Sequence, residues 1–348
     1  MNERAFAIGS TLIRLQSLSK VITKCTLDSR IFYRTPINYL LVNLAVADMV
    51  VATFFAPMHI FVHTFTHPDG FTGTLLCKFL TGGAFAWTGG ASSVFTLVAI
   101  SVERYYAVNY PHGNKGKLTH NKLKVCLSLD IVTNCDTKSG FLILIFSVII
   151  PASWIFAMII NIPEFLVLDF DKAIASCILA WPEEWMGKAY SMLCFLVFGL
   201  LPIPLMVALY SKVVYSLWLK RNDERSPQQM GVVKVRKRVT LMVVTVSVIF
   251  SICWLTDTVI FLLSYYSTAN SPSDVTYAIA AIMVLFNSAV NPFVYALLNQ
   301  RFRNKIKRMI CSSYRSTKGI RNSGDKQGIE SASNYIRKNH TVESFSMG

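Results

Sequence analysis

Residues 94–111 read VFTLVAISVERYYAVNYP, an apolar run that ends abruptly in Glu103, Arg104 and Tyr105. An apolar run with its charges at one end is typical of a helix that crosses a bilayer and stops at the polar boundary. A guanidinium can stay at that boundary when a neighbouring carboxylate compensates its charge. The stretch therefore predicts a membrane-spanning helix that ends in an ion pair.

The composition of the whole chain also favours a membrane protein. Of its 348 residues, 53% are hydrophobic and 15% are charged, whereas soluble domains carry roughly 25% charged residues. Lys and Arg number 34 against 19 Asp and Glu, which fits either a nucleic-acid-binding surface or positive loops beside membrane spans. The eight cysteines are too few for a disulfide scaffold, and none has the spacing of a structural zinc site.

Six apolar stretches are long enough to cross a bilayer, which takes about 20 residues. They cover 36–63, 77–106, 141–162, 189–219, 239–266 and 275–298. The basic stretch 301–310 is amphipathic and is predicted to lie on an anionic leaflet, in contact with membrane lipids. The polar tail 311–348 is predicted to be disordered. Residues 1–34 carry too many charges for a further span.

The charges outside the spans separate by side. The connections 107–124 and 220–238 are strongly basic, and the alternate connections carry most of the acidic residues. Basic connections face the cytoplasm, so the C-terminus is predicted to be cytoplasmic. Because topology accounts for most of the positive charge, we expect no nucleic-acid partner.

Polar residues inside the spans indicate function, because their burial in a membrane is costly. Asp48 lies in the first span, and Asn287, Ser288 and Asn291 lie in the last. Asn287 and Asn291 are one helical turn apart on one face, and Pro292 interrupts the backbone hydrogen bonding beside them. Such oxygen atoms can hold a small hard cation. The alternative is a water-filled polar network without an ion.

Six motifs then follow in order along the spans. They are NLAVAD (43–48), Glu103-Arg104-Tyr105, Trp154, Pro202, the group Phe250, Cys253 and Trp254, and NPFVY (291–295). This series resembles the rhodopsin-like (class A) G-protein-coupled receptors, and within them the neuropeptide receptors. The resemblance implies an all-α membrane protein with a rhodopsin-like seven-helix bundle, in which family helices two to seven are present and amphipathic helix eight follows.

The domain organisation implied by the resemblance has three parts. Residues 1–34 form a basic N-terminal segment in place of the first family helix, 35–310 form the transmembrane domain, and 311–348 form the cytoplasmic tail. Arg104 and Trp154 are further apart than in the family, and an insertion at 126–148 explains the difference. A genuinely long second intracellular loop is the alternative.

The resemblance also assigns roles to residues. Arg104 would meet a heterotrimeric G protein and Glu103 would hold it at rest, while Tyr210 and Tyr295 would stabilise the active state. Trp254, with Phe250 one turn below it, would act as a lever under the ligand pocket. The full set implied for activation is Glu103, Arg104, Tyr105, Tyr210, Phe250, Trp254, Asn291, Pro292 and Tyr295. Arrestin would bind the Ser- and Thr-containing tail.

Two further sites are implied by the same resemblance. The family's sodium pocket corresponds to Asp48, Ser93, Asn287, Ser288 and Asn291, so a sodium ion is expected as an allosteric ligand but no cofactor. Cys77 and Cys177, which lie at the edges of apolar segments, correspond to the family's disulfide. Thr256 stands where the family has a proline after Trp254, and its hydroxyl can bond back to a carbonyl.

The absence of two residues that mark other receptor classes narrows the choice of ligand. Amine receptors have an aspartate where this chain has Ala86, and retinal receptors have a lysine where it has Leu285. The outer connections are acidic, and acidic mouths attract cations. A small basic or amidated neuropeptide is therefore the favoured ligand, and a solvated acidic rim is the alternative. The residues proposed for the pocket are Asp257, Glu164, Glu183 and Trp254.

His59, His63 and His67 have helical spacing at the end of the first span. Neighbouring imidazoles at that spacing can chelate zinc, and membrane-interface aromatics are the alternative interpretation.

Three functional classes compete with a plasma-membrane receptor. A transporter or channel is disfavoured because the chain has no internal repeat. An enzyme is disfavoured because no nucleophile or metal-protease motif is present, and no catalytic residue is proposed. A truncated, non-signalling membrane protein would share the receptor's fold.

Overall fold

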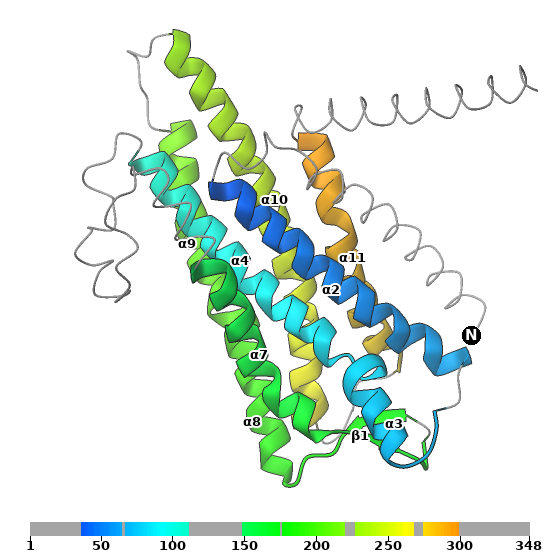
Figure 1. Ribbon diagram of the computed structural model, residues 1–348. Helices are drawn as coiled ribbons and strands as arrows, with labels where there is room; N and C mark the ends of the chain where they lie inside the picture. Colours follow the sequence, from blue (N-terminus) through cyan, green and yellow to red (C-terminus); the bar gives the residue numbers. More distant parts are fainter. Residues whose placement is uncertain are drawn as a thin grey trace, which may run out of the picture. The chain divides into compact units, whose positions relative to one another are not determined.

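The structure, a computed structural model, describes residues 36–64, 67–110, 148–174, 176–219, 227–267 and 274–298. It contains six helical segments long and apolar enough to cross a membrane, which confirms the six predicted spans. They run beside one another in Figure 1. The segments 1–34, 301–310 and 311–348, and nearly all of 126–148, lie outside the described residues, so the predictions made for them stay predictions.

The first span is α2 (Pro36–Thr64), which packs along α4 (Ala84–Asn109). Gly89 of α4 permits this close approach, because a Cβ there would lie 2.9 Å from the carbonyl oxygen of Ala47. The second span was expected to begin at 77, but α4 begins at Ala84. Gly83 interrupts the helix with a φ of 84°, a conformation that is strained for residues with a side chain.

Short helical pieces precede that break. α3 (Phe71–Leu76) continues into the π-turn η2 (Cys77–Thr81), so Cys77 sits on a separate turn ahead of α4. A hairpin of β1 (Leu168–Asp171) and β2 (Ser176–Leu179) lies beside α3, with Phe170 opposite Cys177. Figure 1 places α3 and β1 at the same end of the helices, here called the hairpin end. The all-helical prediction did not include this hairpin.

Prolines lie within the two middle spans and affect their backbone hydrogen bonding. α7 (Ile150–Val167) contains Pro163 and continues past the expected end at 162. The next span comprises α8 (Glu184–Cys194), the π-turn η5 (Phe195–Leu200), α9 (Pro202–Val214) and the π-turn η6 (Tyr215–Leu219). Pro202 has no backbone N–H to continue the regular ladder, and Leu201 just before it donates to the carbonyl of Leu196 at 2.9 Å.

The last two spans are α10 (Pro227–Tyr266) and α11 (Asp274–Leu298). With 40 residues, α10 is about twice the length that crosses a bilayer, and it begins well before the expected 239. Thr256 donates its hydroxyl hydrogen bond to the carbonyl of Ile252 at 2.8 Å, as anticipated for the residue that replaces the family's proline. Fully enclosed apolar side chains such as Leu44, Ile100 and Val284 fill much of the interior, which also contains buried polar residues.

Candidate functional site

Glu103 and Arg104 lie in the last turns of α4, at the end opposite the hairpin, here called the Arg104 end. Both are buried, at 7% and 8% exposure. Arg104 Nη2 donates to Glu103 Oε1 at 2.5 Å, and Arg104 Nε donates to the other carboxylate oxygen. A two-point contact of this kind fixes both side chains and neutralises a charge that is costly to bury. The structure thus confirms that the two residues form an ion pair.

Aromatic and basic side chains surround this ion pair. The rings of Tyr105, Tyr106 and Tyr110 meet edge-on or tilted, with ring centroids 5.4 to 6.2 Å apart. Lys212 of α9 lies 5.8 Å above the ring of Tyr105, a cation–π distance. Beneath them a small apolar cluster, in which Val213 is fully buried, joins α4 to α9. The Arg104 end is therefore a packed junction of several helices.

Tyr210 and Tyr295 are both buried near this junction. The Tyr210 hydroxyl shares a hydrogen bond of 3.1 Å with Ser247 of α10. Arg104 is thus held by Glu103, and Tyr210 by Ser247. The roles in activation that the resemblance implies for these residues stay predictions. Pro292 lies within α11.

A polar group occupies the middle of the bundle, where α2, α4 and α11 meet. Asp48 is 5% exposed and accepts a hydrogen bond of 2.6 Å from Asn291 Nδ2. Ser93 lies beside it on α4, and Asn287 lies one turn from Asn291. Ser288 donates to the Val284 carbonyl at 3.5 Å.

The oxygen atoms of this group are poorly satisfied. Within the described residues, four buried oxygens have no hydrogen-bond partner: Asp48 Oδ1, Ser93 Oγ, Asn287 Oδ1 and Asn291 Oδ1. Buried polar atoms normally find partners, and a hard cation takes carboxylate, amide and hydroxyl oxygens. The donor set therefore fits a small cation. Its four residues are among the five that the resemblance implies for a sodium pocket, and that assignment stays a prediction.

Trp254 is 2% exposed and is packed among aromatic rings from three segments. Phe250 stacks on it at 5.5 Å with an interplanar angle of 19°. Trp87 of α4 and Phe198 of η5 meet it edge-on, at 5.9 Å and 6.3 Å. The stacking of Trp254 on Phe250 follows the one-turn relation seen in the sequence. Trp87 and Phe198 were not foreseen, because they come from other helices.

The acidic residues proposed for a ligand pocket do not all lie together. Glu164 of α7 is 7% exposed and accepts a hydrogen bond of 3.3 Å from the Tyr190 hydroxyl of α8. Asp257 of α10 lies one helical turn beyond Trp254 and is half-buried. Glu183 is exposed just before α8. The buried Glu164 and the half-buried Asp257 are here called the acidic pair, while the exposed Glu183 belongs to the rim.

An aromatic cluster that the sequence did not reveal lies beside this acidic pair. Trp181 packs on Tyr190 at 5.3 Å, and Phe261 meets Tyr190 edge-on at 6.3 Å. Trp181 Nε1 also donates to the Tyr265 hydroxyl at 2.8 Å. These residues come from three segments of the chain, so no local pattern connects them.

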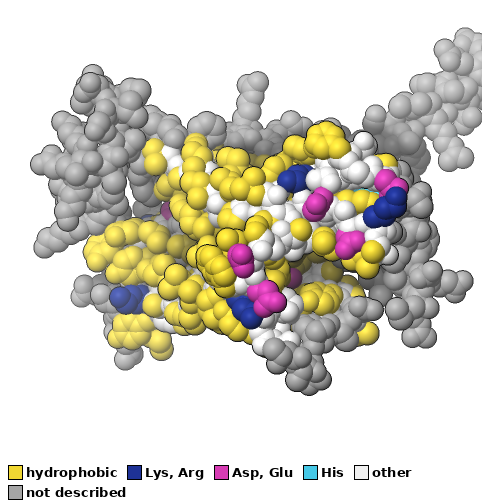
Figure 2. All heavy atoms as spheres, turned by 90° about the horizontal axis from the view of Figure 1, so that it is seen from below, with side chains coloured by type: hydrophobic (Ala, Val, Ile, Leu, Met, Phe, Trp, Pro, Cys, Tyr) yellow, Lys and Arg dark blue, Asp and Glu magenta, His cyan; other side chains and the backbone are white. Residues whose placement is uncertain are grey.

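Figure 2 views the hairpin end and shows Asp and Glu side chains among Lys and Arg.

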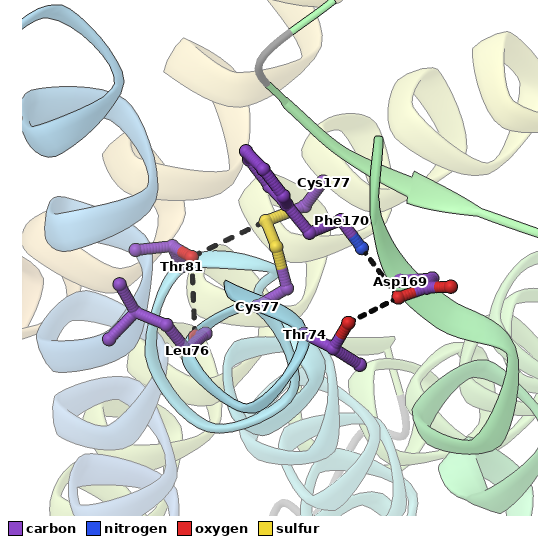
Figure 3. Close-up of a disulfide and its surroundings, with 7 residues drawn as sticks. All are labelled: Thr74, Leu76, Cys77, Thr81, Asp169, Phe170 and Cys177. Carbon is purple, nitrogen blue, oxygen red and sulfur yellow. Dashed lines mark hydrogen bonds between the residues drawn. A yellow bond between two sulfur atoms is a disulfide. The ribbon is translucent and has the colours of Figure 1, made fainter. Parts of the chain in front are cut away.

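The disulfide between Cys77 and Cys177 ties η2 to the hairpin, with a Cα–Cα distance of 5.7 Å. Figure 3 shows the neighbouring hydrogen bonds, in which Thr74 donates to Asp169 at 2.5 Å and Asp169 also accepts from the backbone N–H of Phe170 at 2.8 Å. Both hydrogen bonds hold the pKa of Asp169 below its usual range, and the bond from Thr74 has the larger effect.

A second buried network centres on Asn43, whose function the sequence left open. Its Nδ2 donates to Thr96 at 2.8 Å and to Ser153 at 3.2 Å, and its Oδ1 accepts from Trp154 Nε1 at 3.0 Å. Ser92 adds a further hydrogen bond of 3.2 Å to Ser153. The network joins α2, α4 and α7, and it gives the indole N–H of Trp154 a hydrogen-bond acceptor.

The helical spacing of the three histidines does not persist in the structure. α2 ends at Thr64, so His67 lies beyond the helix and stacks on Phe170 at 5.1 Å. The helical register that motivated a zinc site therefore does not extend to His67, and the prediction of a three-histidine stripe was wrong. The side chains of His59 and His63 lie outside the described residues. No group of three or more His, Cys, Asp or Glu able to hold a metal occurs within the described part.

A sequence model described as "7 transmembrane receptor (rhodopsin family)" matches residues 21–132 and 143–295. The chain belongs to the rhodopsin family of seven-transmembrane receptors. Membership makes it a multi-pass membrane protein of a receptor family rather than an enzyme. The unmatched residues 133–142 lie inside the proposed insertion 126–148.

This rhodopsin-family receptor is similar to several named peptide receptors. It is 27% identical to the pyroglutamylated RF-amide peptide receptor of Rattus norvegicus, across 88% of this chain and 70% of that protein. It is 28% identical to neuropeptide FF receptor 2 of Mus musculus, across 78% and 63%. It is 26% identical to the tachykinin-like peptides receptor 86C of Drosophila melanogaster, across 80% and 53%. These similarities support a receptor of the neuropeptide type.

Proposed function

We propose that this protein is a plasma-membrane receptor that binds a small basic peptide at its hairpin end and activates a heterotrimeric G protein at its Arg104 end. Its relatives are named as receptors for peptides, which supports a peptide ligand. Arrestin is the further partner proposed for the tail 311–348, and membrane lipids for 301–310.

The observation that carries the proposal for a cationic ligand is the acidic pair Glu164 and Asp257. Glu164 of α7 is buried, and Asp257 of α10 is half-buried. Neither forms an ion pair with a Lys or Arg of the described chain. Buried charge normally has a partner of opposite sign, and a guanidinium or ammonium group of the ligand would supply it.

The neighbouring rings add to this proposal. Tyr190 donates to Glu164 and stacks with Trp181, so a cation that reaches Glu164 also lies near aromatic faces. Aromatic faces attract cations, and Arg most often. The exposed Glu183 would act earlier, by attracting the ligand to the mouth, because rim charges mainly change the rate of association.

We also propose that Asp48, Ser93, Asn287, Ser288 and Asn291 hold a sodium ion. The four unpartnered oxygens described above support this proposal. The ion would supply positive charge to a buried carboxylate and hold α2, α4 and α11 together.

Membranes that contain the full chain test the proposed receptor function directly. Binding of arginine-containing amidated peptides is compared with binding of analogues in which citrulline replaces arginine, together with guanine-nucleotide exchange on a G-protein panel. We expect only the arginine peptides to bind and to stimulate exchange. Glu164→Gln should weaken their binding about tenfold or more, because a buried charge loses its partner, whereas Glu183→Gln should mainly slow association.

Arg104→Ala separates binding from signalling. It should abolish peptide-driven exchange and leave peptide binding in place, because Arg104 lies at the far end from the acidic pair. Equal binding of arginine and citrulline peptides would contradict the cationic-ligand proposal. A chain that binds peptide at the cell surface yet drives no exchange would instead fit the non-signalling alternative.

A further inference from the structure

Glu164 is proposed to pair with a cation of the ligand, yet its side chain is enclosed. It is 7% exposed, and Tyr190, which donates a hydrogen bond to it at 3.3 Å, is 5% exposed. The rings of Trp181 and Phe261 pack against Tyr190, at 5.3 Å and 6.3 Å. Because a carboxylate must be reached before it can pair with a cation, some of these rings have to move when a ligand binds.

Trp181 is the ring of this group that comes from an outer connection rather than from a helix. It follows β2, where its backbone N–H donates to the Leu179 carbonyl at 3.1 Å and the N–H of Ala180 donates to the Val167 carbonyl at 2.9 Å. Its indole Nε1 donates to the Tyr265 hydroxyl of α10 at 2.8 Å. The side chain therefore links the hairpin to the outer end of α10, and it contacts Tyr190 on the way.

Gly187 of α8 provides the space for this link. Glycine is unfavourable inside a helix, and such a position usually has a packing or functional reason. A Cβ at Gly187 would lie 2.4 Å from Cε1 and 2.8 Å from Cδ1 of Tyr265, and 3.1 Å from Cδ1 of Trp181. The rings of Tyr265 and Trp181 thus rest against the same point of the α8 backbone, where any side chain would push them away.

The next residue of α10 makes a different contact. Tyr266 donates its hydroxyl hydrogen bond to the Lys188 carbonyl at 3.3 Å, and its side chain is 48% exposed. Within the described residues it forms no hydrogen bond or ring contact with Trp181. Tyr266 therefore joins α8 to α10 in the same place as Tyr265, but without holding the tryptophan.

We propose that Trp181 is a latch in front of Glu164, held closed by its hydrogen bond to Tyr265 and by the space at Gly187. This inference rests on the proposed function. The latch opens to admit the ligand cation and closes again after it, so it slows association and dissociation alike. A conformational change that precedes binding lowers the association rate, and closure over a bound ligand delays its release. Gly187 and Tyr265 are positioning residues, because they act through Trp181.

The rates of peptide exchange test the latch on the full chain in lipid nanodiscs, with a fluorescent arginine-containing amidated peptide. Tyr265→Phe removes the hydrogen-bond acceptor and keeps the ring. We expect it to raise the association and dissociation rates about fivefold each, the effect of one net hydrogen bond, with little change in affinity. Gly187→Ala should do the same by displacing the ring. Tyr266→Phe is the matched control and should leave both rates near those of the parent.

A double-mutant cycle shows whether the hydrogen bond itself is responsible. Trp181→Phe removes the donor and Tyr265→Phe removes the acceptor of the same bond, so the double variant should exchange peptide no faster than either single variant. Additive acceleration would overturn the proposal. Equal acceleration in Tyr266→Phe would also overturn it, because the rates would then depend on the contact between α8 and α10 rather than on the latch.

A measurement without ligand distinguishes the latch from the proposed function. The receptor is labelled with 5-fluorotryptophan, and the fluorine resonance of Trp181 is assigned by its loss in Trp181→Phe. A soluble gadolinium chelate should broaden this resonance more in Tyr265→Phe than in the parent or in Tyr266→Phe. A parent that binds no basic peptide would refute the proposed function alone. Equal broadening in the parent and in Tyr265→Phe would overturn the latch.

Discussion

At the scale of single residues, hydrogen bonds between helices distinguish structural polar groups from functional ones. Asn43 uses its amide on Thr96, Ser153 and Trp154, so its polar atoms are occupied. Asp48 lies five positions further along the same helix and has an unpartnered oxygen. The satisfied residue holds the fold together, whereas the unsatisfied one is available to an ion.

Replacement of Asn43 by alanine should therefore lower stability. The variant loses three hydrogen bonds and leaves the Trp154 N–H without its acceptor, a loss of about 2–3 kcal/mol. Thermal unfolding of the detergent-purified receptor measures the effect. Ser92→Ala is the matched variant, and it should cost less, about 1 kcal/mol, because Ser153 keeps its bonds to Asn43 and to the Ile150 carbonyl. Equal losses in the two variants would mean that Asn43 is not the centre of the network.

At the scale of elements, the hairpin is attached to the bundle in two ways. The disulfide from Cys77 to Cys177 joins β2 to η2, and Thr74 of α3 donates a hydrogen bond to Asp169 of β1. The first attachment is covalent, whereas the second depends on the charge of a carboxylate. Only the second should respond to pH.

The docking of β1 on α3 should weaken in acid. The hydrogen bonds from Thr74 and from the Phe170 N–H lower the pKa of Asp169 below its ordinary value of 3.8. A carboxyl group whose pKa is lowered by folding gives its full stabilisation at pH values above its ordinary pKa. This stabilisation is lost as the pH falls through the lowered pKa of the folded state. Hydrogen exchange of amides in 168–179, corrected for intrinsic rates, should show extra opening between about pH 6 and pH 3.

Asp169→Asn should show that opening at both pH values, because it lacks the charge throughout. Asp171→Asn is the control, since Asp171 accepts a hydrogen bond from the Ala173 N–H inside the turn and does not contact α3 in this way. An Asp169→Asn receptor that keeps the pH response of the parent would assign the response to another group.

At the scale of the whole molecule, the polar centre connects segments that are far apart in the chain. Asp48 and Asn291 are 243 positions apart and are joined by a hydrogen bond. A cation bound there would contact α2, α4 and α11 at once. Any ligand that binds the folded state alone raises its stability.

Sodium should therefore stabilise the receptor against heat. At constant ionic strength, replacement of choline by sodium is expected to raise the midpoint of thermal unfolding, and Asp48→Asn should remove the rise. Asp257→Asn, which alters another carboxyl group outside the ion site, should retain it. A rise that survives in Asp48→Asn would show that sodium acts elsewhere.

The sequence by itself determined the six spans and the polar residues inside them. Each span is one continuous apolar run, and each charged or polar residue in such a run is conspicuous because the membrane penalises it. The ion pair of Glu103 and Arg104 is also local, since its members are adjacent. The five residues proposed for a sodium ion were implied by the family resemblance, through motifs and spacings that each lie within a single helix.

The tertiary structure decided which helices touch and which faces meet. Three contacts cross between helices: that of Trp254 with Trp87, that of Tyr190 with Glu164, and the hydrogen bonds of Asn43. No local window of sequence contains both partners of any of them. The hairpin depends on a disulfide across 100 positions. The apolar residues of a span predict that a helix is present. The rotation of that helix and its contacts depend on how its side chains fit against those of neighbouring helices.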